Sequence, residues 1–265
     1  MDVVTVFHDL LFQPSIVPLV LIATATERVR VGPAALNPYT LHPVEIAGQV
    51  ASLDLVSRGR AFLGLAYGSW LDRLSLEQPR PLQTMGEAVE ICRRLLAGDR
   101  SGFAGERFRL AAGVGLEYEP LRPSVPVMLG TWRPAVAALA AEVADEVKIG
   151  GCANPAMVRR MREWTRGSVR VVVGAVTAVD RDGDRARARA RYAVGRYLDV
   201  VARLDPTLEP GADLPWERFV LAGTPAEVVA QVEELADAGV GRVEFGNPSG
   251  LDLLLSEVVP ALAGR

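Results

Sequence analysis

Residues 29–65 have the sequence VRVGPAALNPYTLHPVEIAGQVASLDLVSRGRAFLGL, which predicts a strand, a helix and a second strand in succession. Residues 29–36 and 61–65 are the two strands. Residues 43–56 predict the helix, because they place apolar side chains at helical spacing, at Val44, Ala47, Val50, Ala51 and Leu55. Gly59 suits the left-handed position that ends such a helix. A helix between two strands predicts that the strands run parallel.

The same alternation continues on both sides of this stretch. Strands are expected at residues 3–7, 29–36, 61–65, 127–130, 146–149, 169–178 and 240–245. Helices are expected at residues 15–26, 43–56, 84–97, 134–143, 154–166, 184–204, 224–238 and 251–262. Thr224, Pro225 and Glu227 have the residue types of a capping box, with proline at the first helical position.

This order predicts an α/β fold with a parallel sheet, and most simply a (β/α)8 barrel in one domain spanning residues 1–265. A dinucleotide-binding sheet is disfavoured, because no GxGxxG motif follows the first strand. Seven strands are one fewer than a closed parallel barrel normally has.

Composition narrows the function classes. The chain has 265 residues, of which 49% are hydrophobic, and a net charge of −3. The charge argues against a nucleic-acid partner, and the sequence has no apolar run or leader typical of a membrane or secreted protein. The two cysteines, Cys92 and Cys152, fit neither a disulfide framework nor a zinc site, so a cytoplasmic protein is expected.

Three other segments have patterns that bear on function. Residues 98–123 form a long connection, in which residues 106–110 suggest a short hairpin arm. Residues 180–184 resemble a calcium loop, but the glycine is misplaced and Arg191 stands at the twelfth position, so a turn and helix cap is expected and no metal. The arginines of the following helix predict a solvated face.

Several motifs, in order along the chain, resemble one family. They are residues 27–33 (ERVRVGP), 37–43 (NPYTLHP), 52–60 (SLDLVSRGR), 126–130 (PVMLG) and 223–227 (GTPAE). Together they resemble the luciferase-like flavin and deazaflavin oxidoreductases. The NPYT and HP residues most resemble the methylenetetrahydromethanopterin reductases, which use coenzyme F420. The resemblance covers nearly the whole chain and implies a luciferase-like barrel.

In that family a first strand and helix precede the segment that here begins at Met1. The resemblance and the count of seven strands both predict a barrel that lacks its first β/α unit. The neighbouring helices would then expose apolar residues such as Leu19, Ile22 and Leu262. Uncovered strand edges favour association, so a homodimer is expected.

Cofactor-binding residues are expected at the carboxyl ends of the strands, where barrel enzymes have their sites. The resemblance implies a non-proline cis peptide at Ala34–Ala35 behind the deazaflavin ring, although Ala34 replaces the commoner glycine. Asn37 is either a ligand of the polar ring edge or a turn residue. The resemblance places Tyr67, Gly68 and Ser69 near the ribityl and phosphate portion. Residues at a helix N-terminus suit the phosphate: Gly130, Thr131, Trp132 and Arg133.

His8 is the expected general acid or base, because an imidazole titrates near neutral pH and residue 8 ends a strand. Asp9 is the alternative, or the partner that orients His8. His42 is expected to be a helix cap or a wall residue.

Three functions remain open from the sequence. The first is hydride transfer between F420 and a small organic substrate. The second is an FMN-dependent monooxygenase. The third is a degenerate barrel that binds a ligand or partner without catalysis. The NPYT stretch favours the first.

Overall fold

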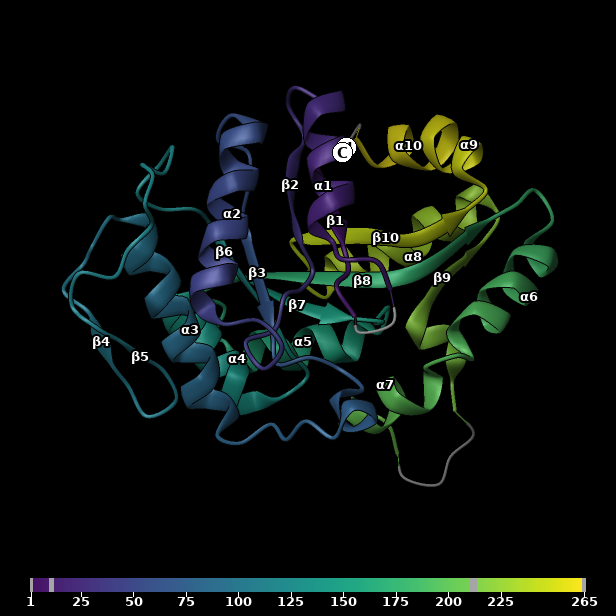
Figure 1. The fold of residues 1–265 in the computed structure, drawn as a ribbon. Helices are drawn as coiled ribbons and strands as arrows, with labels where there is room; N and C mark the ends of the chain where they lie inside the picture. Colours follow the sequence, from purple (N-terminus) through teal and green to yellow (C-terminus); the bar gives the residue numbers. More distant parts are fainter. Residues whose placement is uncertain (1, 10–11, 210–213, 264–265) are drawn as a thin grey trace. The chain divides into compact units, whose positions relative to one another are not determined.

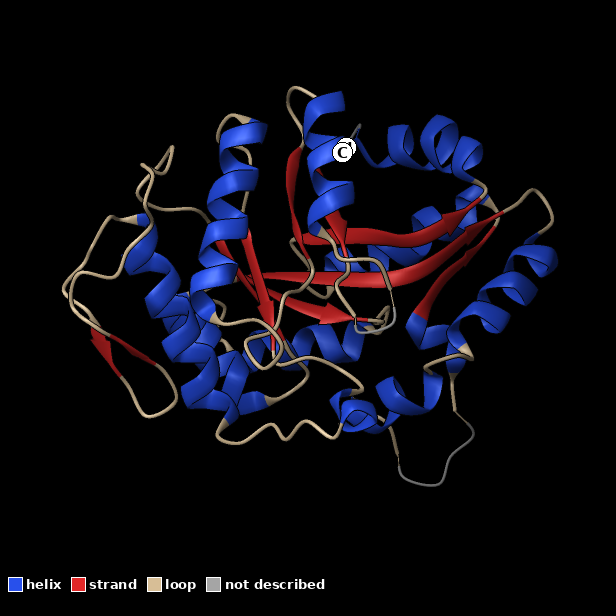
Figure 2. Ribbon diagram, in the orientation of Figure 1, coloured by secondary structure: helices blue, strands red, loops and turns tan. Residues whose placement is uncertain are grey.

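A computed structural model describes residues 2–9, 12–209 and 214–263. Helices and strands alternate along the chain, as predicted (Figure 2). The chain divides into two compact units, each described here by itself. Unit 1 comprises Met1–Gly130 and Glu142–Asp145, and unit 2 comprises Thr131–Ala141 and Glu146–Arg265.

Unit 1 is built on four parallel strands. They are β1 (Val3–Val6), β2 (Arg30–Pro33), β3 (Leu63–Ala66) and β6 (Val127–Gly130). β1 pairs with β2 and β3 pairs with β6, while the bridges Val31–Ala61 and Leu36–Leu65 join β2 to the β3 segment. Its helices are α1 (Ile16–Ala25), α2 (Pro43–Ser57) and α3 (Pro81–Leu96), shown in purple to blue in Figure 1.

The predicted turn after α2 is confirmed. Arg58 and Gly59 both have positive φ, 57° and 84°, and their N–H groups donate to the last carbonyls of the helix. His42 caps the start of α2, since its Nδ1 accepts from the N–H of Val44 at 3.3 Å. Leu19 is fully buried and packs in a core cluster with Ala23, Val31, Leu53 and Ala61. The expectation that Leu19 would be uncovered is therefore wrong.

The long connection after α3 carries the expected hairpin. A 3-10 helix, η1 (Leu71–Leu74), precedes α3, and the strands β4 (Phe103–Ala104) and β5 (Arg109–Leu110) follow it as an antiparallel pair. The carboxylate of Glu87 fixes the hairpin turn by accepting three backbone N–H bonds, from residues 106, 107 and 108, at 2.7, 2.9 and 2.9 Å.

Unit 2 is built around β8 (Arg170–Val179). β8 pairs in parallel with β7 (Glu146–Gly150), β9 (Val220–Gly223) and β10 (Arg242–Ser249). The helices of this unit are α4 (Pro134–Val143), α5 (Pro155–Trp164), α6 (Gly183–Val194), α7 (Leu198–Leu204), η2 (Trp216–Phe219) and α8 (Pro225–Asp237). The last helix is continuous through α9 (Leu251–Leu253), the π-helical η3 (Leu254–Val258) and α10 (Val259–Ala263). The capping box at Thr224 and Glu227 is present.

Two predictions about these elements are corrected. β9 was missed, so that eight strands, and not seven, have a parallel partner within the described residues. Among the described residues, β9 pairs only with residues 176–179, at the end of β8, and branches off the path of strand neighbours, so it does not test whether a first β/α unit is missing. The helix expected at 184–204 is broken after α6, where the chain turns at Gly195 and the half-buried Tyr197 precedes the first residue of α7, Leu198.

Candidate cofactor and catalytic site

His8 follows the carboxyl end of β1 and is half-buried. Its Nδ1 accepts a hydrogen bond from the backbone N–H of Ser15, at 3.1 Å, and lies 3.1 Å from the Ser15 hydroxyl. Ser15 is buried and occupies the N-cap position of α1, although its side chain makes no capping hydrogen bond. Burial lowers the pKa of the His8 imidazole from its ordinary value of 6.5. The residue is therefore held as a neutral ring beside the strand ends.

The peptide bond between Ala34 and Ala35, just after β2, is cis, as the resemblance implied. Asn37 follows and is buried. Its Oδ1 accepts from the N–H groups of Tyr39 and Thr40, at 3.1 and 3.0 Å. The side-chain carbonyl of Asn37 therefore makes the predicted turn. Its amide nitrogen lies toward Gly68, so the predicted role as a ligand of the ring edge stays a prediction.

Residues 67–69 follow β3. Gly68 has φ +82°, and a Cβ there would lie 3.0 Å from the Nδ2 of Asn37. The side-chain amide of Gln78 donates to the carbonyl of Tyr67 and, at 3.4 Å, to the carbonyl of Gly68. These two hydrogen bonds hold the loop in place. Ser69 is exposed. A glycine in this conformation leaves a bare stretch of backbone beside a buried amide, which is the kind of surface that a flat ring can approach closely.

Unit 1 thus gathers most of the predicted residues at one edge. The N–H of Ala34 donates to Val6, that of Leu36 to Gly64, and that of Ala66 to Leu36. Gly130 ends β6 beside Ala66, whose Cβ is 3.2 Å from the site of a Cβ on Gly130. Because these strands are parallel neighbours, the residues after them share one end of the sheet.

The other predicted cofactor residues belong to unit 2, where they precede α4. The Oγ1 of buried Thr131 accepts from the N–H of Arg133 at 2.9 Å. The indole N–H of buried Trp132 donates to the carbonyl of Gly150 at 3.0 Å, and its ring lies 6.4 Å from that of Phe219. The Arg133 side chain is exposed. Trp132 is therefore committed to packing, whereas Arg133 is open to an anion.

Four charged side chains that were not predicted as a group form a mostly buried chain of ion pairs in unit 2. Glu146 and Lys148 lie on β7, and Arg242 and Glu244 lie on β10. Arg242 donates to Glu146 at 2.6 Å and to Glu244 at 3.1 Å, and Lys148 donates to the other oxygen of Glu244. The sequence carries a signal for them, because charged residues alternate with apolar ones in EVKI and RVEF, the period of one strand face.

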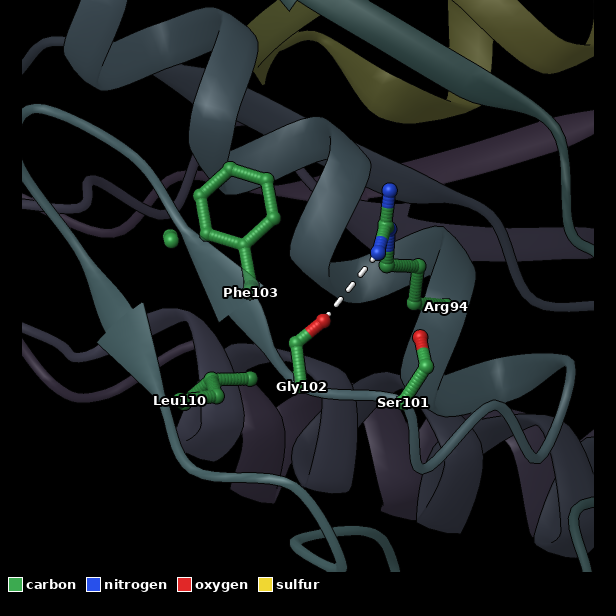
Figure 3. A pocket seen from close by; sticks show the side chains of 6 residues that line it. Arg94, Ser101, Gly102, Phe103 and Leu110 are labelled. Atoms are coloured by element: carbon green, nitrogen blue, oxygen red, sulfur yellow. Dashed lines mark hydrogen bonds between the residues drawn. The ribbon is translucent and has the colours of Figure 1, made fainter.

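A surface hollow beside the hairpin is a poor site. It is lined by Arg94, Ser101, Gly102, Phe103, Ala104 and Leu110 (Figure 3). Arg94 points across it but is already used, since it donates to Gly102 at 3.1 Å and to Glu90 at 2.7 Å and lies over the Phe103 ring. This groove is explained by the anchoring of the hairpin to α3.

Metal and thiol chemistry find no support in the parts that the structure describes. Within residues 2–9, 12–209 and 214–263, no three His, Cys, Asp or Glu side chains are grouped as metal ligands. Burial raises the pKa of both Cys92 and Cys152 to about 12, so neither is a thiolate at neutral pH.

The arginine-rich helix α6 forms ion pairs with nearby carboxylates. Arg185 and Arg189 both pair with Asp180. Over the same described residues, no helix is long and apolar enough to cross a membrane.

Comparison with known proteins confirms the resemblance drawn from the motifs. The model of the luciferase-like monooxygenase family matches residues 6–242. A 5,10-methylenetetrahydromethanopterin reductase of Archaeoglobus fulgidus is 29% identical, with 92% of this chain and 86% of the relative covered. An F420-dependent glucose-6-phosphate dehydrogenase of Microbacterium testaceum is 25% identical, with coverage of 97% and 86%. The coenzyme F420 dependent tetrahydromethanopterin reductase of Methanopyrus kandleri has the same fold, with a TM-score of 0.84, 22% identity, and coverage of 98% and 91%.

Proposed function

We propose that this chain, which belongs to the luciferase-like monooxygenase family, transfers a hydride between coenzyme F420 and a small organic substrate. The observation that carries the proposal is that relatives similar over almost the whole chain are named as F420-dependent oxidoreductases. The reductase from Archaeoglobus fulgidus, with 29% identity, agrees with a reductive role.

The residues after β2 and β3 fit a flat ring. Asn37 is buried with its carbonyl occupied by its own turn, so its amide group keeps a fixed orientation. Gly68 has no side chain to crowd that amide. We assign the ring to residues 34–37 and the neighbouring ribityl portion to residues 67–69. Residues 130–133 are assigned to the phosphate, with Arg133 supplying positive charge.

When bound, F420 supplies or accepts the hydride. The protein's part is to hold the reacting carbon near the ring and to stabilise charge that develops on the substrate. His8 lies at the end of β1, where it can contact a polar atom of the substrate, and Asp9 follows it. His42 takes no part in this scheme, because its Nδ1 caps α2.

Two alternatives are kept. The family's name supports an FMN-dependent monooxygenase, which would consume oxygen. A barrel that binds a ligand or partner without catalysis would show neither activity. We also propose a homodimer in the cytoplasm. Light scattering tests the oligomeric state against the mass of 28.4 kDa for one chain.

An anaerobic assay with F420 and an aerobic assay with FMN separate the three functions. Reduced F420 is mixed with the protein and a panel of small ketones, imines and related acceptors, and its reoxidation is followed by visible absorbance. We expect reoxidation that depends on protein and acceptor and needs no oxygen. In the aerobic assay, protein-dependent oxygenation of an organic substrate with reduced FMN, beyond the uncatalysed oxidation of reduced FMN by oxygen, would instead support the monooxygenase. Absence of both activities, with no retained cofactor, would support a binding protein.

A further inference from the structure

The hydrogen bond between Ser15 and His8 fixes which ring nitrogen carries the proton. A backbone N–H can only donate, so the His8 Nδ1 that receives it at 3.1 Å must be unprotonated. A neutral imidazole has one N–H, which is then on Nε2. The Ser15 hydroxyl, also 3.1 Å from Nδ1, can share the same lone pair by donating. The ring thus has a defined tautomer before any substrate arrives.

We propose that His8 acts as a neutral hydrogen-bond donor through its Nε2–H toward the substrate atom that becomes negative during hydride transfer, and that Ser15 is the residue that positions it. The proposal rests on the proposed function. It replaces the expectation that His8 is a general acid or base, because a neutral Nε2–H ring has no free lone pair at Nε2 to accept a proton. Giving up its proton would leave an imidazolate, which is a poor species at neutral pH.

The reaction balances without a proton from His8. In the direction of reduction, a C–H bond forms at the substrate's carbonyl carbon from the hydride of reduced F420, and the π electron pair moves to oxygen. F420 is oxidised and the substrate is reduced. The His8 Nε2–H stabilises the developing negative oxygen, and water supplies the proton that completes the alcohol. Fixed donors aimed at developing charge stabilise transition states strongly, because they need no reorganisation.

The position of Ser15 explains why the tautomer persists. Ser15 is 1% exposed, and its backbone stands at the start of α1. A proton on Nδ1 would face the N–H of Ser15, and two donors cannot form a hydrogen bond. The buried N–H of Ser15 would then lose its acceptor, and no water could take the acceptor's place. The lowered pKa of His8 through burial agrees with a neutral ring.

The test of the tautomer needs no cofactor. The chain has two histidines, so a protein labelled with 15N-histidine gives two ring spin systems, and a His42→Gln variant identifies that of His8. Long-range 1H–15N correlation at neutral pH is expected to show His8 protonated at Nε2 alone. A ring protonated at Nδ1, or at both nitrogens, would overturn the inference.

Matched variants test the roles. Ser15→Ala removes the hydroxyl but keeps the N–H, and is expected to keep the Nε2–H tautomer. Ser15→Pro removes the N–H as well at a φ of −62° that proline accepts, and is expected to release the tautomer preference. If the proline variant fails to fold, the alanine variant and the wild-type spectrum still decide the question.

Turnover with reduced F420 tests the chemistry. Loss of one such donor costs about 100-fold or more in kcat, so His8→Ala is expected to fall by that factor. His8→Gln, whose side-chain amide can donate but cannot carry a proton, is expected to recover most of the loss. Equal loss in both variants would contradict the donor role. A correct tautomer in a protein without F420 turnover would refute the proposed function and leave the tautomer assignment standing.

Discussion

Lys148 and Glu244 form an ion pair across the strand that separates them. Lys148 lies on β7, Glu244 lies on β10, and β8 runs between them. The pair can form because β8 has Gly174 at this level, where a Cβ would lie 3.1 Å from the Lys148 Cε. Glu244 also binds Arg242, so one carboxylate serves two cations.

This arrangement predicts unequal costs for removing the two partners. Glu244→Leu removes the ion-pair partner of the mostly buried Lys148, while Arg242 keeps Glu146, and it is expected to cost about 3–5 kcal/mol of unfolding free energy. Lys148→Met leaves Glu244 paired with Arg242 and is expected to cost clearly less. Urea unfolding of the two variants measures the difference. Equal losses would mean that Arg242 does not hold Glu244 in solution.

Gly68 is predicted to matter for the cofactor beyond its backbone conformation. Gly68→Ala adds a Cβ 3.0 Å from the Asn37 amide, at a φ of +82°. Gly98→Ala is the matched control, because Gly98 has φ +73° and nothing within 4 Å of the added Cβ. Both variants are expected to lose about 1–2 kcal/mol of stability from the left-handed backbone.

Only Gly68→Ala is expected to weaken F420 binding, by about tenfold or more, which corresponds to 1.4 kcal/mol. Fluorescence titration of F420 into both variants is the measurement. Unchanged affinity in Gly68→Ala would remove residues 67 to 69 from the proposed site.

His8 is predicted to make stability depend on pH in the weakly acidic range. Its pKa is lowered in the folded protein by burial, so the unfolded chain binds more protons below a pH of about 6.5. Stability should therefore fall as the pH drops from 6.5 toward the lower folded pKa, and it should level off below that value. Urea unfolding at a series of pH values is expected to show this fall in the wild type and a smaller one in His8→Gln. Identical pH profiles would show that the His8 pKa is not lowered.

The sequence was sufficient for the parts of the fold that local chemistry dictates. α4 has the predicted bounds, 134–143, because proline opens it, and the capping box at Thr224 formed as its residue types require. β9 was missed because it has four residues and runs directly into that cap. Its signal was the helix at 224–238, which had no strand assigned before it although every other helix did.

The places of the candidate site residues at the strand ends were predictable, whereas their local contacts were not, and their role in binding stays a prediction. The rule that barrel sites follow strand ends selected His8, Asn37 and Gly68. The bond from Ser15 to His8 was beyond the sequence, because it depends on how the loop between β1 and α1 folds back. The charged layer was not predicted. Strands of parallel sheets are typically apolar on both faces, whereas the alternation in EVKI and RVEF marks one polar face.

The proposed function is tested most directly by one equilibrium measurement, the dissociation constants of F420 and FMN for the same preparation of this protein. F420 is titrated into the protein and followed by its fluorescence, and FMN is titrated separately under the same conditions. We expect F420 to bind tighter than FMN by at least about tenfold, a difference of about 1.4 kcal/mol. FMN binding that is equal or tighter would contradict the assignment and favour the FMN-dependent monooxygenase.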